Sequence, residues 1–303
     1  MGRSGRLCPP DAMVARILGI ILPVFVVILV GYFYARRVHP DMSQVNRLSM
    51  VILGPALIFS ALASKDFDIA ANLSLMAGSV GVVLGSGLLA WPVARLAKVD
   101  YRTLVPTAMF NNCGNMGLPL AVLAFGQAGF SAMVALFTIS NLLQFTLGIR
   151  IIDHHAKFWH FLRSPMVWAT ALGFAFALTH PPMPEWAYTG IRMVGDAMIP
   201  VMLISLGVRL YEVRWDDWRI GVIGGIACPV TGLVMALVLA PVLGLSETQR
   251  GLLVLFGALP PAVLNFMVAE QLRHEPGKVA SIVLIGNVMS VIFVPVGLAL
   301  AIQ

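Results

Sequence analysis

The sequence has few charged side chains and few cysteines. Only 11% of its 303 residues are Asp, Glu, Lys or Arg, whereas a soluble domain has about 25%. Hydrophobic residues make up 59% of the chain, and the mean hydropathy is +0.89. One soluble core cannot bury so much apolar surface, so we expect lipid to cover it. The three cysteines, Cys8, Cys113 and Cys228, have no CxxC spacing and form no disulfide framework.

The net charge of +6 does not indicate a nucleic-acid-binding protein. The cations lie in short loops between apolar runs rather than on one face of a domain. A membrane protein with a basic cytoplasmic side has the same kind of charge excess. The expected partner of this chain is therefore the lipid bilayer, and no nucleic acid is expected.

Apolar runs divide the chain into ten candidate transmembrane segments, since a span with a short loop takes roughly 30 residues. Residues 1–12 are polar and lack the features of a signal peptide, so we interpret them as an N-terminal tail, with Met13 as an alternative start. No loop is long enough for a separate soluble domain. The ten segments are 13–35, 46–63, 72–96, 103–125, 130–151, 165–180, 187–209, 220–243, 250–270 and 279–301.

Lys and Arg concentrate in the loops that follow the odd-numbered segments, from Arg36 and Arg37 to Arg273 and Lys278. Short basic loops stay in the cytoplasm. This pattern predicts a multi-pass protein of the cell (inner) membrane with both termini on the outer side. The arginines of the N-terminal tail argue mildly against that orientation.

Short sequence matches indicate an internal repeat. Residues 118–123 read LPLAVL and residues 259–264 read LPPAVL, and Asn141 and Asn287 end a second matching pair, Ile-Ser-Asn and Ile-Gly-Asn. A third match pairs Pro55 with Pro200. The matches keep their order at separations of roughly 140 to 146 residues, which favours a true repeat over chance.

The repeat divides the chain into two halves of five segments, 13–152 and 165–303, with a short cytoplasmic linker at 153–164. Five is an odd number, so the second half enters the membrane from the opposite side. An inverted repeat of this kind is typical of secondary transporters.

The fourth segment contains the run NNCGNMGLP at residues 111–119, which disfavours a continuous helix. The run begins about 15 Å from Arg102 along a helix, close to the middle of the membrane. The ninth segment has Gly257, Pro260 and Pro261 at a similar depth from Arg250. Two helices broken in corresponding places predict a binding site, because their free N-terminal N–H groups suit an anion. The alternative is that Pro and Gly only kink packed helices.

Four stretches together resemble the auxin efflux carrier family. They are NNCGNMGLPL from Asn111, LPPAVLN ending at Asn265, GPALIFSAL around Pro55, and IPVMLISLGVRL from Ile199. The resemblance covers the chain from Met13 to the end. Because the linker is short, the chain is similar to the bacterial members, which include malonate and malate permeases, rather than to the plant carriers.

The resemblance implies an all-α integral membrane fold of ten transmembrane helices in two inverted five-helix repeats, with broken, crossing fourth and ninth helices. It also implies that a mono- or dicarboxylate is moved by an elevator-like alternating-access motion. A homodimer is expected from fold analogy alone. By residue match, the substrate would meet Asn111, Asn112, Asn115 and Asn265, at a crossover that includes Gly114, Gly117, Pro119, Gly257, Pro260 and Pro261.

The predicted segments also contain polar residues outside the two breaks. Asp196 is the one carboxylate placed well inside a segment, and it is a candidate for coupling to H⁺ or Na⁺ unless the seventh segment begins close to it. Asn141, Gln144 and Asn287 are candidates for supporting the broken helices or lining the site. Arg209, at the end of the seventh segment, is a candidate for a cytoplasmic anion path, but a snorkelling side chain is the favoured interpretation.

Competing classes of protein have weaker support. An intramembrane enzyme would need a His/Glu or Ser/His constellation inside a segment, and the sequence has no HExxH motif. A channel needs no inverted pair of broken helices. An ion-coupled symporter or antiporter of a non-carboxylate solute stays open. No cofactor and no metal ion is expected.

Overall fold

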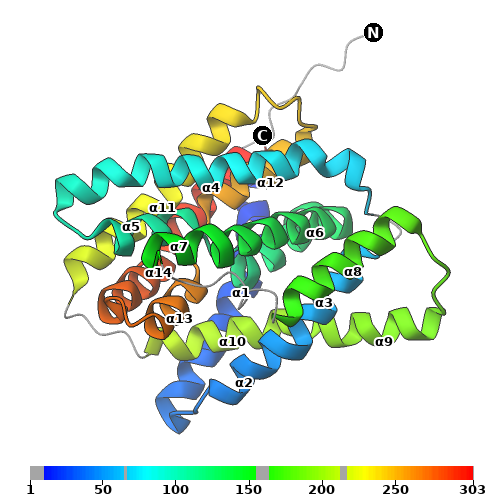
Figure 1. Cartoon of the computed structure of the whole chain (residues 1–303), viewed down its shortest axis with the longest axis horizontal. Helices are drawn as coiled ribbons and strands as arrows, with labels where there is room; N and C mark the ends of the chain where they lie inside the picture. The colour runs from blue at the N-terminus through cyan, green and yellow to red at the C-terminus, as the bar shows by residue number, and fades with distance from the viewer. Residues whose placement is uncertain (1–9, 65–66, 155–163, 212–216, 303) are drawn as a thin grey trace.

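The computed structural model describes residues 10–64, 67–154, 164–211 and 217–302 (Figure 1). Within these ranges the secondary structure is helical, apart from one isolated antiparallel bridge between Asn111 and Pro261. Residues 1–9 of the expected tail and 155–163 of the expected linker lie outside the described residues. The predicted all-α class is confirmed.

The first part of the chain is built from α-helices and three short π-helical segments, labelled η. In order they are α1 (Pro10–Val38), α2 (Ser43–Leu48), η1 (Ser49–Leu53), α3 (Gly54–Leu62), α4 (Ile69–Ala97), α5 (Tyr101–Met109), η2 (Cys113–Gly117), α6 (Leu118–Leu143), η3 (Gln144–Gly148) and α7 (Ile149–Ile152). The later part consists of α8 (Pro165–Thr179), α9 (Glu185–Asp196), α10 (Met198–Tyr211), α11 (Trp218–Leu239), α12 (Glu247–Ala258), α13 (Val263–Gln271) and α14 (Pro276–Ala301).

Seven helical stretches of the described chain are long and apolar enough to cross a membrane, and α8 is a shorter apolar helix. The expected fourth and fifth segments are not separated by a loop. Instead α6 consists of two helical pieces that meet at a kink at Gly126, where φ is 71° and ψ is −163°. Glycine tolerates this backbone conformation because it has no Cβ. The count of ten segments stays a prediction.

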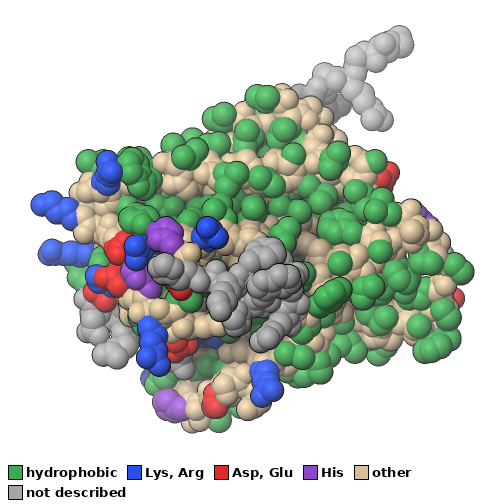
Figure 2. Space-filling view, viewed as in Figure 1, with side chains coloured by type: hydrophobic (Ala, Val, Ile, Leu, Met, Phe, Trp, Pro, Cys, Tyr) green, Lys and Arg blue, Asp and Glu red, His purple; other side chains and the backbone are tan. Residues whose placement is uncertain are grey.

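The outer faces of the helices are apolar. Leu96, Trp186 and Leu88 are 85%, 80% and 77% exposed, far more than large apolar side chains are in a water-soluble protein. Figure 2 shows hydrophobic side chains over most of the visible surface, with charged side chains gathered at one end. That end carries the turns between α4 and α5 and between α13 and α14, and we call it the charged end. Such a surface suits a bilayer with one basic side.

Glycines allow several helix pairs to pack closely. A Cβ atom at Gly207 of α10 would collide with the backbone oxygen of Ile28 in α1. A Cβ atom at Gly31 would likewise collide with the oxygen of Ile204. Packing of helices through small residues is typical of membrane proteins, where apolar side chains gain little by leaving lipid.

An ion-pair cluster joins two turns at the charged end. Thr103 Oγ1 donates a 2.6 Å hydrogen bond to Glu275 Oε2, and Lys278 forms an ion pair with Glu275 Oε1. His274 Nε2 lies 3.4 Å from Asp100 Oδ2. Partial burial by itself would raise the pKa of Glu275, but hydrogen bonds from Lys278 and Thr103 outweigh it and hold the pKa below its ordinary value.

A lowered pKa predicts that Glu275 stabilises the fold above its ordinary pKa and that this contribution is lost as the pH falls through the lower, folded-state value. We expect the Tm of the purified protein, measured by intrinsic fluorescence in detergent, to decrease as the pH is lowered below about 4.5. Glu275→Gln should lower the Tm at pH 7 and flatten this acid dependence. The matched control, Glu185→Gln, removes an exposed carboxylate at the start of α9 and should keep the wild-type profile. Identical profiles for the two variants would contradict the assignment.

Candidate functional site

Two helices are broken, and their extended breaks cross each other. The first break, residues 110–112, separates α5 from η2, and the second, residues 259–262, separates α12 from α13. The Asn112 backbone N–H donates to the Pro260 oxygen at 2.6 Å, and the Ala262 N–H donates to the Phe110 oxygen at 2.9 Å. The two breaks thus satisfy each other's backbone groups, as a non-helical segment within a membrane requires.

Two amide pairs fasten the crossing to neighbouring helices. Asn112 Nδ2 donates to Asn287 Oδ1 at 2.7 Å, and Asn287 Nδ2 donates to the Pro261 oxygen at 3.0 Å. On the other side, Gln144 Nε2 donates to Asn265 Oδ1 at 2.8 Å, and Asn265 Nδ2 donates to the Phe110 oxygen at 2.9 Å. Asn112 lies in the first break, and Asn265 lies in α13, directly after the second break. Each is hydrogen-bonded to an amide side chain from another helix. Asn112, Asn265, Gln144 and Asn287 are all buried.

The repeat motif LPLAVL is not equivalent in structure to LPPAVL. Pro119 lies in the first turn of α6, a position that accepts proline because the first N–H groups have no partner within the helix. Pro260 and Pro261 instead lie in the extended second break. Pro119 therefore lies just after the first break, because helical geometry resumes at Cys113, before the proline is reached.

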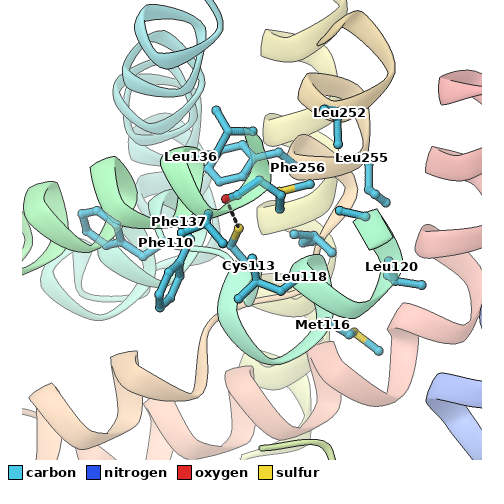
Figure 3. Packing of buried hydrophobic residues seen from close by; sticks show 14 of the residues in the cluster. Phe110, Cys113, Met116, Leu118, Leu120, Leu136, Phe137, Leu252, Leu255 and Phe256 are labelled. Carbon is cyan, nitrogen blue, oxygen red and sulfur yellow. Dashed lines mark hydrogen bonds between the residues drawn. The ribbon is translucent and has the colours of Figure 1, made fainter. Parts of the chain in front are cut away.

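The glycines near the breaks have separate packing roles. The backbone of Gly114 approaches the Phe137 ring, and that of Gly117 approaches the Leu259 side chain, so closely that each has room for no Cβ. Gly257 packs against Gly232 of α11. Figure 3 shows the apolar wall beside the first break, where residues of η2 and α6 lie close to those of α12. The residues labelled there are Phe110, Cys113, Met116, Leu118, Leu120, Leu136, Phe137, Leu252, Leu255 and Phe256.

A cavity lies against the crossing. Three of the four residues predicted to contact the substrate, Asn111, Asn112 and Asn115, line this cavity. Asn111 Nδ2 donates to the Phe256 oxygen at 2.5 Å, while its Oδ1 is buried and has no hydrogen-bond partner among the described residues. The polar residues that line the cavity are Asn46, Ser49, Asn111, Asn112, Asn115, Asn141, Gln144, Ser205 and Arg209, and its methionines are Met50, Met166, Met198, Met202 and Met267.

Asn265, a predicted substrate contact, does not line this cavity. It instead borders a smaller space on the side of the charged end, with Thr103 and His274. Asn141, by contrast, lines the central cavity and does not support a break as Asn287 does. Among described residues, Gln144 takes the supporting role in that part of the chain.

Helix α10 contributes a face that sequence reasoning missed. Met198, Met202, Ser205 and Arg209 line the cavity at intervals of about one helical turn. Ser205 Oγ donates to Asn46 Oδ1 at 3.1 Å, which brings α2 into the same wall. The spacing of these residues in the run MIPVMLISLGVRL carried the signal for this face. The signal is weak, because an isolated Arg at a helix end is ordinarily a snorkelling residue.

Asp196 lies away from the cavity. It is the last residue of α9, its side chain is 52% exposed, and its Oδ2 is 3.6 Å from Arg192 Nε one helical turn earlier. It is not among the residues lining the central cavity. The position of a carboxylate along a segment therefore does not place it at the site, because the helix face decides which way it points.

The crossing and the cavity define the class: a multi-pass helical membrane protein with a polar site between two broken helices, an arrangement typical of transporters. The membrane transport protein family matches residues 16–160 and 155–298. The chain belongs to this family. It is the same family, named after the auxin efflux carriers, that the motifs of the chain resemble. Its family members are membrane transporters and not enzymes.

Two similar proteins extend over nearly the same length. An "Uncharacterized transporter" of Methanothermobacter thermautotrophicus is 26% identical over 296 residues, covering 91% of this chain and 95% of the relative. A protein of Rhizobium meliloti named "Putative malonate transporter" is 25% identical over 305 residues, covering 91% of this chain and 93% of the relative. The similarity therefore includes both breaks and the cavity.

Proposed function

We propose that this protein is a secondary transporter that moves a small organic anion, a mono- or dicarboxylate, by alternating access. In this proposal the helices form ten transmembrane segments in two inverted five-helix repeats. The substrate binds in the cavity beside the crossing. H⁺ or Na⁺ is the candidate coupling ion, and the name of the Rhizobium meliloti relative supports a carboxylate as cargo.

The observation that carries the proposal is the charge and polarity of the cavity. Arg209 is the one charged side chain among the described residues that line it, and no carboxylate lines it. The beginnings of η2 and α13 also border it, through Gly114, Asn115, Val263 and Leu264. Helix N-termini and an arginine both stabilise a negative charge. Asparagine amides add donors for a carboxylate and acceptors for a hydroxyl.

Purified protein in liposomes provides the direct test. Labelled malonate, malate and indole-acetate are offered in counterflow assays, with the pH and Na⁺ gradients varied independently. We expect at least one acid to exchange, and the gradient that drives its accumulation identifies the coupling ion. If no acid moves and none raises the Tm of the protein, the cargo is not a carboxylate, and an ion-coupled carrier of another solute is the alternative.

Asn115 provides a residue-level test, because it borders the cavity and is only partly buried. Loss of one hydrogen bond to a charged substrate costs about 1.5–3 kcal/mol, so Asn115→Ala should weaken substrate binding roughly tenfold to a hundredfold. The Tm without substrate should stay close to that of the wild type. Asn72→Ala, on the exposed first turn of α4, is the matched control and should bind and transport normally. Wild-type affinity in Asn115→Ala would remove this residue from the site.

A further inference from the structure

Arg209 lies where two spaces meet. One is the central cavity, and the other is a cleft between the end of α10 and helices α13 and α14. Both spaces are lined by Arg209 and Val263. The cleft also includes Asp217 and Glu270, close to the charged end of the molecule. Arg209 therefore borders both the cleft near that end and the cavity.

The face of α10 that lines the cavity changes from apolar to polar and then to charged along its length. Met198 and Met202 form the inner part, Ser205 follows, and Arg209 is the last residue of the row. The row spans about 16 Å from its first to its last residue, since a helix rises 1.5 Å per residue. A small acid bound in the cavity can thus place a carboxylate at Arg209 and its uncharged part against the methionines. Methionine side chains are flexible and adapt to varied shapes.

We propose that Arg209 is a specificity-determining residue that selects anionic over neutral substrates by binding a carboxylate at the junction of cleft and cavity. This inference rests on the proposed function. The planar guanidinium matches a carboxylate through two parallel hydrogen bonds, which an ammonium group cannot reproduce. Asp217 and Glu270 make the outer cleft unfavourable for an anion. Arg209 offsets this repulsion where the substrate leaves the cleft and enters the cavity.

The test compares malonate with its neutral diamide, malonamide, as competitors of substrate binding and uptake in liposomes. For Arg209→Gln we expect the affinity for malonate to fall at least tenfold, while the affinity for malonamide changes less than threefold. The preference for malonate over malonamide should therefore decrease. Arg209→Lys keeps the charge but loses the two-point geometry, and it should fall between wild type and Arg209→Gln.

Arg219→Gln is the matched control, because it removes an exposed arginine that lies over Trp218 at the start of α11. It should leave both affinities unchanged. An Arg209→Gln protein that folds and retains the wild-type preference for malonate overturns the inference. If Arg209→Gln is not recovered folded, wild-type selectivity and affinity in Arg209→Lys would overturn it. Absence of binding and uptake of any acid by the wild type would instead contradict the proposed function itself.

Discussion

Asn287→Ala is expected to abolish transport and to lower the Tm of the protein. Asn287 accepts a hydrogen bond from Asn112 and donates to the oxygens of Pro261 and Val283. The Pro261 oxygen belongs to the second break, so no α-helical hydrogen bond replaces this contact. Alanine would leave the Asn112 amide and the Pro261 oxygen without these partners, at a cost of roughly 1–3 kcal/mol for each group. Both breaks lose their shared anchor in α14.

A double-mutant cycle with Asn112→Ala separates this anchor from a substrate contact. If the Asn112–Asn287 pair fixes the crossing, each single variant should have a lower free energy of unfolding than the wild type. The loss in the double variant should then be smaller than the sum of the two single losses by about 1 kcal/mol. The free energy of unfolding is measured in detergent without substrate, and transport is measured in liposomes. Ser290→Ala is the control on the same helix, since within the described part of the chain Ser290 Oγ donates only to the Asn287 backbone oxygen. Additive losses of stability would show that the two amides act independently.

The sequence was sufficient to predict the breaks, because Asn111, Asn112, Pro260 and Pro261 interrupt otherwise apolar segments. An interruption in an apolar run must find polar partners in the protein, so its approximate place follows from composition. Most of the hydrogen bonds between the breaks and their partners join residues more than a hundred positions apart, as the bond between Gln144 and Asn265 does. Sequence alone therefore indicated a polar centre without showing which amides hold the backbone and which face the cavity.

The misplaced residues share one physical cause. Position along a segment gives depth, but only packing determines the direction of a side chain. Asp196 points outward and pairs with Arg192, whereas Arg209, assigned to snorkelling, lines the cavity. Pro119 was expected at the crossover by residue match, and it lies in the first turn of the helix after the break. Short apolar motifs recur easily in membrane helices, where few residue types are in use.

Gly257→Ala is expected to reduce both the folded yield and transport. Gly257 packs against Gly232 so closely that a Cβ atom on either glycine would collide with the backbone oxygen of the other. A backbone oxygen cannot rotate away as a flexible side chain can, so α11 and α12 would have to separate. Overpacking of this kind costs about 1–3 kcal/mol.

The effect should reach the site because Gly257 lies just before the second break. A displaced α12 moves the Pro260 oxygen, which accepts the 2.6 Å hydrogen bond from the Asn112 N–H. We therefore expect the Tm to fall by several degrees and uptake to fall more than the folded yield does. Gly190→Ala is the matched control, since a Cβ atom there meets nothing within 4 Å. Uptake that falls only in proportion to folded protein would mean that the crossing tolerates separation of α11 and α12, and that the amide pairs alone maintain it.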